Sequence, residues 1–520
     1  MTNARTAPRR GSRGYALSLR PRLAGPVLAP AVGGLVGSLL VLVTAGRAAT
    51  VPGATPPSRW WGLLAPVHGD WMPGLVPLAL IAGVSLLLGS WLRLVQLAKH
   101  GQLSIPAVGA VAVLWALPLL LGPPLLSLDA YSYAAQGELL RAGGDPYRVG
   151  PEALGGGSAL AAVDPFWRSA RAPYGPLALL TARLATSLGN PVAALLALHL
   201  VAALALVLVA VAVCDLSPAH RRPLVLVLAV ANPLILLQLL AAAHWEALMV
   251  AGLVAALALW RRQHPLAAVA MASVATAVKP PAALAVLVLA AAHVVAVPAI
   301  GQRVRATGKV VAAAALPWVL LAPLVPNAAG FLPALSTPLA GRTLYAPTTL
   351  LAEIIAVLGH VLGVPVHFDG LLARTRVLGL ALAAVVTAGL LLTWRRRSPA
   401  ETIGGGLLVV ALLGPVLYPW YLSWGLLPLV VAGRRWDWPV TALSAAAVFT
   451  ALPGCQQLSV FLPVVRPHPG TTFTAATLLA VGVAVLVIRA GGGTRAALVR
   501  TGSVEENEAA PSVPRATARR

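Results

Sequence analysis

Acidic side chains are rare in this 520-residue sequence, and they gather in one stretch. Only 15 residues are Asp or Glu, and a third of them lie between positions 123 and 175. These are Asp129, Glu138, Asp145, Glu152 and Asp164. A carboxylate can take the proton of an attacking hydroxyl group, so this stretch is the first candidate for a reactive site.

Asp129 is the strongest candidate for a catalytic base because it follows an apolar stretch that ends near Leu121. A carboxylate there is expected at the membrane–water boundary, where it could meet both a lipid headgroup and a water-borne acceptor. In a helix, Tyr133 returns to the same face as Asp129. The alternative is that Asp129 caps the helix that follows, and the two roles can coexist.

Other polar and aromatic residues are candidates for contacts with a sugar or an acceptor. Near Asp129 they are Tyr131, Tyr133, Gln136, Glu138, Asp145, Tyr147 and Tyr174; farther along the chain they are His244, Glu246 and Tyr345. Two glycines precede Asp145-Pro146-Tyr147, which predicts a turn and favours a structural role there over contact with substrate.

Three basic residues are candidates for binding a phosphate group. Lys279 is the one lysine expected on the outer side of the membrane, and apolar sequence flanks it. A charge near membrane depth is costly and is usually functional, although a lysine that snorkels to the interface is the alternative. Arg342 and Arg171 are the other two candidates.

An aromatic cluster, Tyr418-Pro419-Trp420-Tyr421 with Trp424, is expected near the same side. We favour a belt of rings at the headgroup level over rings that stack on a sugar.

Common cofactor signatures are missing from the sequence. It has no P-loop, no dinucleotide-binding fingerprint, no His-Glu-x-x-His pair and no Asp-x-Asp pair. Its two cysteines, Cys214 and Cys455, are expected on opposite faces of the membrane, so no disulfide is predicted. No metal ligands are assigned and no cofactor is required, although a divalent metal ion remains possible.

The composition predicts an all-α integral membrane protein. Hydrophobic residues make up 58% of the chain and charged residues 10%, and the mean hydropathy is +0.84. A soluble domain carries about 25% charged residues. Apolar stretches long enough to span a bilayer as helices begin near residues 26, 73, 104, 190, 223, 246, 266, 282, 310, 376, 403, 421, 440 and 472. We therefore expect a bundle of about 12–14 transmembrane helices.

The net charge of +23 reflects membrane orientation. Most Lys and Arg residues fall in alternate connections between the apolar stretches, in compact groups such as Arg395–Arg397 and Arg434-Arg435. Basic residues concentrate on the cytoplasmic side of membrane proteins. Both termini are therefore expected in the cytoplasm, the lipid bilayer is the expected partner, and nucleic-acid binding is not expected.

The chain is expected to form one membrane domain over residues 24–490. A basic arm (1–23) and a polar tail (491–520) are expected to be disordered. Two long outer segments, 123–189 and 326–375, interrupt the domain, and loops this long are usually functional. Each contains a short apolar piece. We expect 176–188 to form an interfacial or re-entrant helix and 350–362 to lie along the membrane surface.

Several of these motifs together resemble one enzyme family. They are Asp129-Ala-Tyr-Ser-Tyr-Ala-Ala-Gln-Gly, Gly-Gly-Asp145-Pro-Tyr-Arg-Val-Gly-Pro151, Ala-Pro-Tyr174-Gly-Pro, Asn232-Pro233, Ala-His244-Trp-Glu246-Ala-Leu-Met and Ala-Val-Lys279-Pro-Pro-Ala-Ala. The sequence resembles the polyprenol-phosphomannose-dependent α-1,6-mannosyltransferases of actinobacteria, which have the GT-C glycosyltransferase fold. The resemblance covers most of residues 25–490.

The resemblance implies an inverting transfer of mannose at the outer face of the plasma membrane. The donor would be polyprenyl-phosphate-mannose, and the acceptor a growing α-1,6-mannan of a lipomannan or lipoarabinomannan core. Enzymes of this fold take a catalytic base from the first large outer loop, a position that matches Asp129. Lys279, Arg342 and Arg171 would then stabilise the departing phosphate.

Two other hypotheses remain open at this point. A related enzyme could use another polyprenyl-phosphate sugar, such as an arabinofuranosyl donor, or a protein acceptor. A flippase or transporter for lipid-linked sugars would do no chemistry. The gathering of acids in outer loops argues against transport, because transporters place their binding sites near the membrane midplane.

Overall fold

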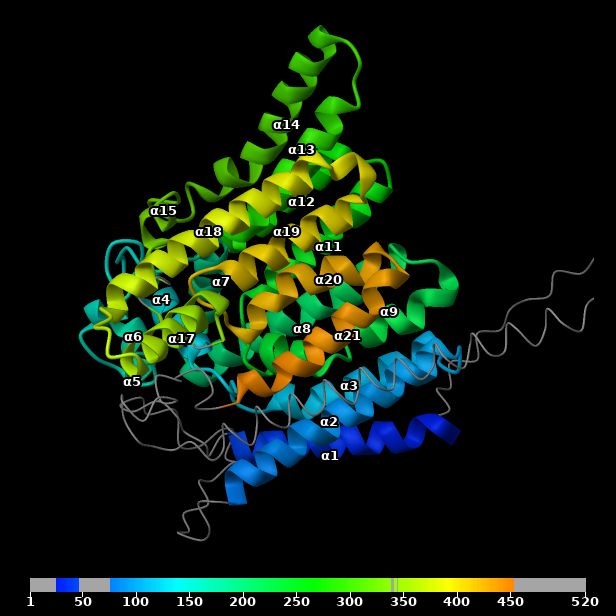
Figure 1. Cartoon of the computed structure of the whole chain (residues 1–520), viewed down its shortest axis with the longest axis vertical. Helices are drawn as coiled ribbons and strands as arrows, with labels where there is room; N and C mark the ends of the chain where they lie inside the picture. The colour runs from blue at the N-terminus through cyan, green and yellow to red at the C-terminus, as the bar shows by residue number, and fades with distance from the viewer. Residues whose placement is uncertain (1–24, 46–74, 338–340, 344, 453–520) are drawn as a thin grey trace, which may run out of the picture.

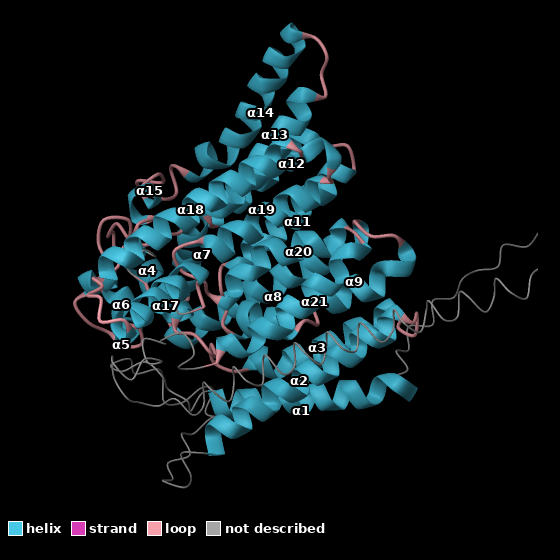
Figure 2. Ribbon diagram, viewed as in Figure 1, coloured by secondary structure: helices cyan, strands magenta, loops and turns pink. Residues whose placement is uncertain are grey.

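The computed structural model describes residues 25–45, 75–337, 341–343 and 345–452. Within these residues every regular element is a helix, and no strand occurs (Figures 1 and 2). The expectations for 1–23, for the last apolar stretch near 472, for Cys455 and for 491–520 lie outside the described residues.

Apolar helices of very different lengths form the bundle. They are α1 (Leu28–Ala45), α2 (Leu75–Lys99), α3 (Ile105–Leu121), α8 (Pro191–Asp215), α9 (Arg222–Ala229), α11 (Glu246–Arg261), α12 (Pro265–Val278), α13 (Ala283–Val295), α14 (Ile300–Leu321), α18 (Phe368–Leu392), α19 (Pro399–Leu413), α20 (Ser423–Ala432) and α21 (Asp437–Ala447). Further helices lie in the connections: α4 (Asp129–Arg141), α5 (Ser158–Ala161), α6 (Pro165–Arg168), α7 (Pro176–Thr186), α10 (Pro233–Ile235), α15 (Phe331–Ala334) and α17 (Pro347–Val361).

The length and composition of these helices make the chain a polytopic membrane protein. Five described helices, α1, α2, α8, α14 and α18, are long and apolar enough to cross a bilayer alone, and one bent pair of helices adds a sixth candidate. Six further described helices are apolar but have only 10–17 residues. The all-α prediction is confirmed, and the number of spans stays a prediction.

Most helices begin within three residues of the apolar stretches that predicted them. Two begin much earlier, since α14 starts at Ile300 and α18 at Phe368, whereas the apolar stretches start near 310 and 376. Arg303, Arg305 and Lys309 therefore belong to the first turns of α14. A helix can continue beyond the apolar core of a bilayer, and hydropathy does not detect that part.

Helices α1 and α2 pack backbone to backbone through glycines. A Cβ atom at Gly37 would lie 2.7 Å from the carbonyl oxygen of Gly83, so only glycine permits this approach. The indole N–H groups of two buried tryptophans are satisfied across helices. Trp115 donates to the carbonyl of Ala31 at 2.9 Å, and Trp91 donates to that of Val227 at 2.8 Å.

The stretch 123–189 is folded into the bundle and does not cover it as a loop. Helix α4 is buried on most sides, and its Gly137 lies directly against the backbone of Ala182 on α7. Helix α7, predicted from its apolar sequence, also contacts α8 and α12. These contacts fix the start of α4, which carries Asp129, inside the molecule.

Candidate active site

Asp129 is the first residue of α4, and its carboxylate is directed into the bundle. Leu128 is the residue at the N-cap position, and the N–H of Asp129 donates to Oγ of Ser127 at 3.2 Å. The alternative that Asp129 caps this helix is therefore wrong. The side chain is 13% exposed, and a negative charge in the first turn interacts favourably with the helix dipole.

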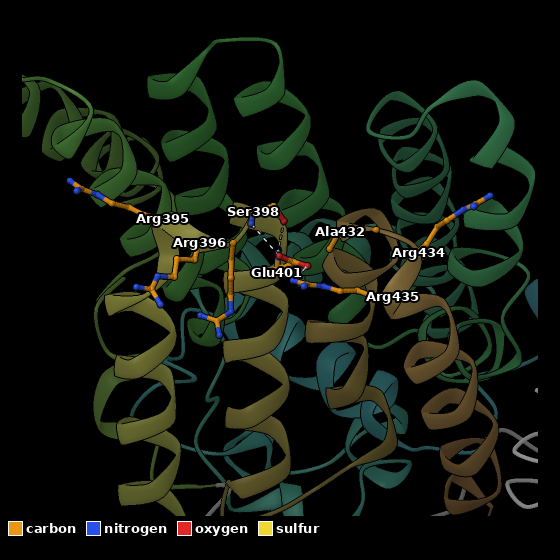
Figure 3. A pocket seen from close by; sticks show the side chains of 9 residues that line it. Arg395, Arg396, Ser398, Glu401, Ala432, Arg434 and Arg435 are labelled. Carbon is orange, nitrogen blue, oxygen red and sulfur yellow. Dashed lines mark hydrogen bonds and ion pairs between the residues drawn. The ribbon is translucent and has the colours of Figure 1, made fainter. Parts of the chain in front are cut away.

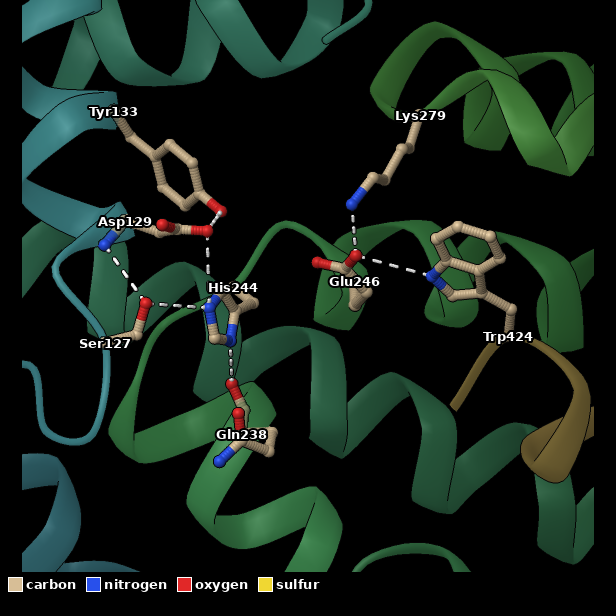
Figure 4. A network of polar contacts seen from close by, with 8 residues as sticks. All are labelled: Ser127, Asp129, Tyr133, Gln238, His244, Glu246, Lys279 and Trp424. Atoms are coloured by element: carbon tan, nitrogen blue, oxygen red, sulfur yellow. Dashed lines mark hydrogen bonds and ion pairs between the residues drawn. The ribbon is translucent and has the colours of Figure 1, made fainter. Parts of the chain in front are cut away.

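His244 lies beside Asp129, although α8 and α9 separate the two in sequence (Figure 4). Its Nε2 atom is 3.5 Å from Oδ2 of Asp129 and 3.2 Å from Oγ of Ser127. Its Nδ1 atom is 2.6 Å from the carbonyl oxygen of Gln238. Because a carbonyl can only accept, Nδ1 carries a proton, and Nε2 is the nitrogen that faces Asp129.

The backbone around this pair adopts uncommon conformations. Residues Leu236–Ala241 form a π-helical turn, and Ala243 follows with φ = 53°. On the other side of the pair, Leu126 has φ = 66°. Non-glycine residues rarely adopt positive φ, and such strain tends to gather at functional sites. The two strained residues place Ser127 and His244 against each other.

Lys279 and Glu246 form a second polar pair in the same region (Figure 4). Both side chains are buried, and Nζ of Lys279 pairs with Oε1 of Glu246. The indole N–H of Trp424 donates to the same carboxylate at 3.3 Å. Lys279 therefore points into the protein, and the snorkelling alternative is wrong. Its backbone is extended because α12 ends at Val278 and Pro280 disfavours helix at the preceding residue.

Aromatic rings surround the Lys279 ammonium group. Its Nζ lies 4.5 Å from the ring centre of Tyr421, 5.3 Å from that of Trp424 and 5.6 Å from that of Tyr174. Ring faces attract cations, most strongly where water is excluded. These rings and Glu246 together stabilise a charged lysine at a buried position.

Tyr133 connects the two polar pairs. Its hydroxyl group donates to Oδ2 of Asp129 at 3.4 Å, and its ring meets the ring of Tyr174 edge-on at 5.2 Å. Burial, with the charges of Asp129 and Glu246 nearby, raises the pKa of Tyr133 well above its usual range. The hydroxyl group therefore stays protonated and remains a donor to Asp129.

The aromatic cluster at Tyr418–Trp424 completes the wall of the site. The ring of Trp420 stacks on His244 at 3.9 Å and on Tyr418 at 4.6 Å, and Tyr421 stacks on Trp424 at 4.3 Å. Both tryptophans are buried. The prediction of a headgroup belt is wrong, because these rings contact charged side chains inside the bundle.

The two arginines predicted to bind phosphate are not in this cluster. Arg342 is exposed and pairs with Asp369 at 2.6 Å. Arg171 is exposed, and its backbone carbonyl accepts a hydrogen bond from Thr337. Of the three basic candidates, the structure brings only Lys279 close to the acids of the site.

The Asp145 segment forms the predicted turn. Oδ1 of Asp145 accepts the N–H of Tyr147 at 2.9 Å, and Oδ2 accepts from Asn327 at 3.2 Å. Tyr147 is buried against Phe331. The Asp145 carboxylate thus holds together two connections that are far apart in sequence.

The remaining candidates are more dispersed. Glu138 is half-exposed and lies 3.9 Å from Arg141 on α4. Tyr131 is buried, Tyr345 is half-buried, and Gln136 is buried with no hydrogen-bond partner for its side-chain amide. Within the described residues, no three His, Cys, Asp or Glu side chains gather closely enough to hold a metal ion.

Ser127 and Gln238 contribute to the site, and the sequence did not indicate them. A serine two positions before an aspartate is common in sequences, and every residue has a backbone carbonyl, so neither feature stands out before the fold is known. The oxygen Oε2 of Glu246 is also buried without a hydrogen-bond partner, beside the Lys279 pair. An unpaired buried carboxylate oxygen is costly, and such exceptions in a folded protein need a specific reason.

The buried carboxylate, the neighbouring histidine and the aromatic wall of this polytopic helical protein fit a membrane-embedded glycosyltransferase. Residues 31–297 match the family model described as "Alpha-(1->6)-mannopyranosyltransferase, N-terminal domain", and residues 348–490 match the "MptB C-terminal domain". The chain therefore belongs to the α-(1→6)-mannopyranosyltransferase family.

Individual relatives agree with this assignment. The chain is 36% identical to α-(1→6)-mannopyranosyltransferase A of Mycobacterium tuberculosis, over 78% of this chain and 80% of the relative. It is 29% identical to α-(1→6)-mannopyranosyltransferase B of Corynebacterium glutamicum, over 72% of this chain and 65% of the relative. No solved structure matches the chain. Mannosyl transfer is thus confirmed.

Proposed function

We propose that this mannosyltransferase takes mannose from a polyprenyl-phosphate-mannose donor and adds it to a growing α-1,6-mannan of the lipomannan or lipoarabinomannan core. The transfer inverts the anomeric configuration and takes place at the outer face of the plasma membrane. The names of the relatives support the linkage, and the distribution of basic residues supports the side of the membrane.

The convergence of Asp129, His244, Lys279 and Glu246 carries this proposal. The four residues come from three separate stretches of sequence, since His244 and Glu246 are near neighbours, and they meet in one aromatic-lined site. One pair offers a carboxylate base, and the other offers a buried cation. Glycosyl transfer from a lipid phosphate needs both, a base for the acceptor and a positive charge for the leaving group.

In the proposed reaction, Asp129 takes the proton from an acceptor hydroxyl group as its oxygen attacks C1 of mannose. The bond between C1 and the phosphate oxygen breaks, and polyprenyl phosphate leaves with the electron pair. Attack from the face opposite the phosphate turns a β-linked donor into an α-linked product. Tyr133 donates to the Asp129 carboxylate and holds it in place during this step, and Nε2 of His244 lies beside the same oxygen.

Lys279 stabilises the departing phosphate in this proposal. An ammonium group has three donors, and Glu246 occupies only part of this capacity. The Glu246 pair fixes the position of Nζ, and the remaining donors can meet a phosphate oxygen. Since the leaving group is a monophosphate, the reaction does not require a metal ion, although it could use one.

Reconstituted full-length protein tests the proposal. Vesicles would receive radiolabelled polyprenyl-phosphate-mannose and a short α-1,6-mannoside, and extension of the acceptor would be followed with time. We expect a product that an α-mannosidase digests, and almost none with Asp129→Asn. A β-linked product would contradict inversion, and transfer from a nucleotide sugar alone would contradict the lipid donor.

A further inference from the structure

The ends of α19 and α20 farthest from the proposed active site form a cleft rich in arginine. The two helices pack together and run in opposite directions, with the Tyr418–Trp424 cluster between them at one end. At the other end, the turn before α19 lies beside the turn after α20 (Figure 3). A cleft of about 580 Å³ opens there. It is lined by Arg395, Arg396, Arg397, Ser398, Glu401, Ala432, Gly433, Arg434 and Arg435.

The cleft carries a large excess of positive charge. Five of its nine lining residues are arginines, and Glu401 is the one acid among them. The carboxylate of Glu401 already accepts from Trp436 at 3.0 Å and from the N–H of Ser398 at 3.2 Å, and it pairs with Arg435. The other four guanidinium groups have no carboxylate in the lining to balance them.

The arginines are available to a ligand. All five arginine side chains are exposed. In Figure 3, Arg435 extends across the cleft toward Glu401, and the side chain of Arg396 lies beside the end of α18. Arg395 and Arg434 extend outward on either side of the cleft. A guanidinium group can donate two parallel hydrogen bonds to the oxygens of a phosphate group. Several arginines around one opening can therefore bind the same phosphate.

Apolar surface continues from the cleft along α18. Leu392, one turn before the arginines, is 85% exposed, and Val385 is 69% exposed. The turns themselves contain Trp394 and Trp436, and tryptophan is enriched where a membrane meets water. A ligand that combines a phosphate with long apolar chains would therefore contact both surfaces at once.

We infer that this cleft binds the headgroup of an anionic phospholipid from the leaflet on that side of the membrane. Its phosphate would lie among the arginines, and its acyl chains would lie along the outer face of α18. The tendency of basic residues to stay in the cytoplasm explains arginines in each turn separately. The antiparallel packing of α19 and α20 brings two such turns, about 40 residues apart in sequence, around one opening, where their positive charges add.

Native mass spectrometry of the full-length protein tests this inference. The purified protein would be mixed with phosphatidylglycerol or with phosphatidylcholine in neutral detergent, and the retained lipid would be counted. Arg396→Gln/Arg397→Gln should weaken retention of phosphatidylglycerol about thirtyfold, because each basic residue at an anionic surface contributes about fivefold in affinity. Arg435 is left unchanged, since it balances Glu401.

Two further variants control for charge and folding. Arg303→Gln/Arg305→Gln removes two exposed arginines from α14, outside the cleft, and should leave lipid retention unchanged. Arg396→Lys/Arg397→Lys keeps the charge and should retain most of the lipid. If the α14 variant lost as much phosphatidylglycerol as Arg396→Gln/Arg397→Gln does, the proposed site would be wrong. It would also be wrong if the wild type retained phosphatidylcholine as well as phosphatidylglycerol. Displacement of the lipid by millimolar inorganic phosphate would mean that the site takes free phosphate, which would overturn the lipid assignment.

Discussion

Nε2 of His244 lies 3.5 Å from Oδ2 of Asp129, and the other ring nitrogen of His244 is held by a backbone carbonyl. This arrangement leaves one orientation for the imidazole ring. In that orientation a neutral ring can accept at Nε2 a proton that Asp129 has taken from a substrate, and the imidazolium so formed can then donate to the carboxylate. The stack on Trp420 keeps the ring from turning away.

Asp129→Asn should abolish mannosyl transfer while leaving the fold intact. The amide has the same shape and keeps the hydrogen bond from Tyr133, but it cannot take a proton. A positioned base typically raises the rate of the chemical step about 10²–10⁴-fold, so we expect kcat to fall by a factor of about 10³. Glu152→Gln, at an exposed position of the same connection, makes the same chemical change and should have no effect. Activity within tenfold of the wild type in Asp129→Asn would remove Asp129 from the role of base.

His244→Gln should lower kcat by about tenfold or more and leave KM for the acceptor nearly unchanged, since the ring contacts the base. A double-mutant cycle with Asp129→Asn separates this role from a structural one. If His244 acts through Asp129, replacing His244 should lower kcat little further in a protein that already carries Asp129→Asn. If the two substitutions lower kcat independently, so that their factors multiply in the double variant, His244 does not act through Asp129.

The sequence located Asp129 and His244 separately but could not show that they meet. Asp129 stood out because an acid after an apolar span is unusual, and Lys279 and Glu246 stood out because charges there are costly. The contacts between them depend on a π-helical turn and on Ala243 at positive φ. Neither feature has a reliable local signal in a single sequence.

The helices could be predicted more completely than the site. Hydropathy detects the apolar core of a span, so the starts of α8 and α11 were predicted to within a residue. It does not detect whether an aromatic ring faces lipid or protein, and the burial of Trp420 and Trp424 was missed for that reason. Arg342 was expected beside the phosphate, but an exposed partner, Asp369, is available to it in the fold.

Removing one charge of the Lys279–Glu246 pair should destabilise the protein more than removing both. Lys279→Met leaves a buried carboxylate unbalanced, which typically costs about 3–5 kcal/mol. Lys279→Met/Glu246→Gln removes both charges, so the midpoint of thermal unfolding should return most of the way to that of the wild type. Activity should stay low in both variants, because the donor phosphate has lost its cation. Full activity in the stable double variant would contradict a role for Lys279 in phosphate binding.

Asp164 predicts a pH dependence of stability. Burial, with a smaller contribution from the charge of Asp129, raises the pKa of Asp164, although the N–H of Phe166 and the charge of Arg168 partly oppose the shift. The folded state therefore holds the Asp164 proton to a higher pH than the unfolded state does. Its stabilising contribution is complete at low pH and is lost as the pH rises through the folded-state pKa.

Asp164→Asn should therefore stabilise the protein slightly at pH 7, since an asparagine can still accept the N–H of Phe166 at the start of α6. The difference in stability between Asp164→Asn and the wild type should shrink as the pH is lowered through the range in which Asp164 takes up its proton. Thermal unfolding between pH 4 and pH 7.5 measures this difference. If Asp164→Asn were stabilised over the wild type by the same amount at every pH, the charge of the Asp164 carboxylate would not be the cause.

Gly137→Ala should separate α4 from α7 and so disturb Asp129 without touching it. A Cβ atom at position 137 would lie 2.4 Å from the backbone carbon of Ala182 and 2.5 Å from its oxygen. Backbone atoms cannot turn aside, so the helices must move apart, at a cost of about 1–3 kcal/mol.

Gly109→Ala on α3 is the matched control, because nothing lies within 4 Å of the added methyl group. Alanine favours the helix by about 1 kcal/mol over glycine, so this variant should be as stable as the wild type or slightly more. We expect kcat to fall at least tenfold in Gly137→Ala and to stay unchanged in Gly109→Ala. Unchanged kcat in both would show that the position of α4 on α7 does not set the geometry of Asp129.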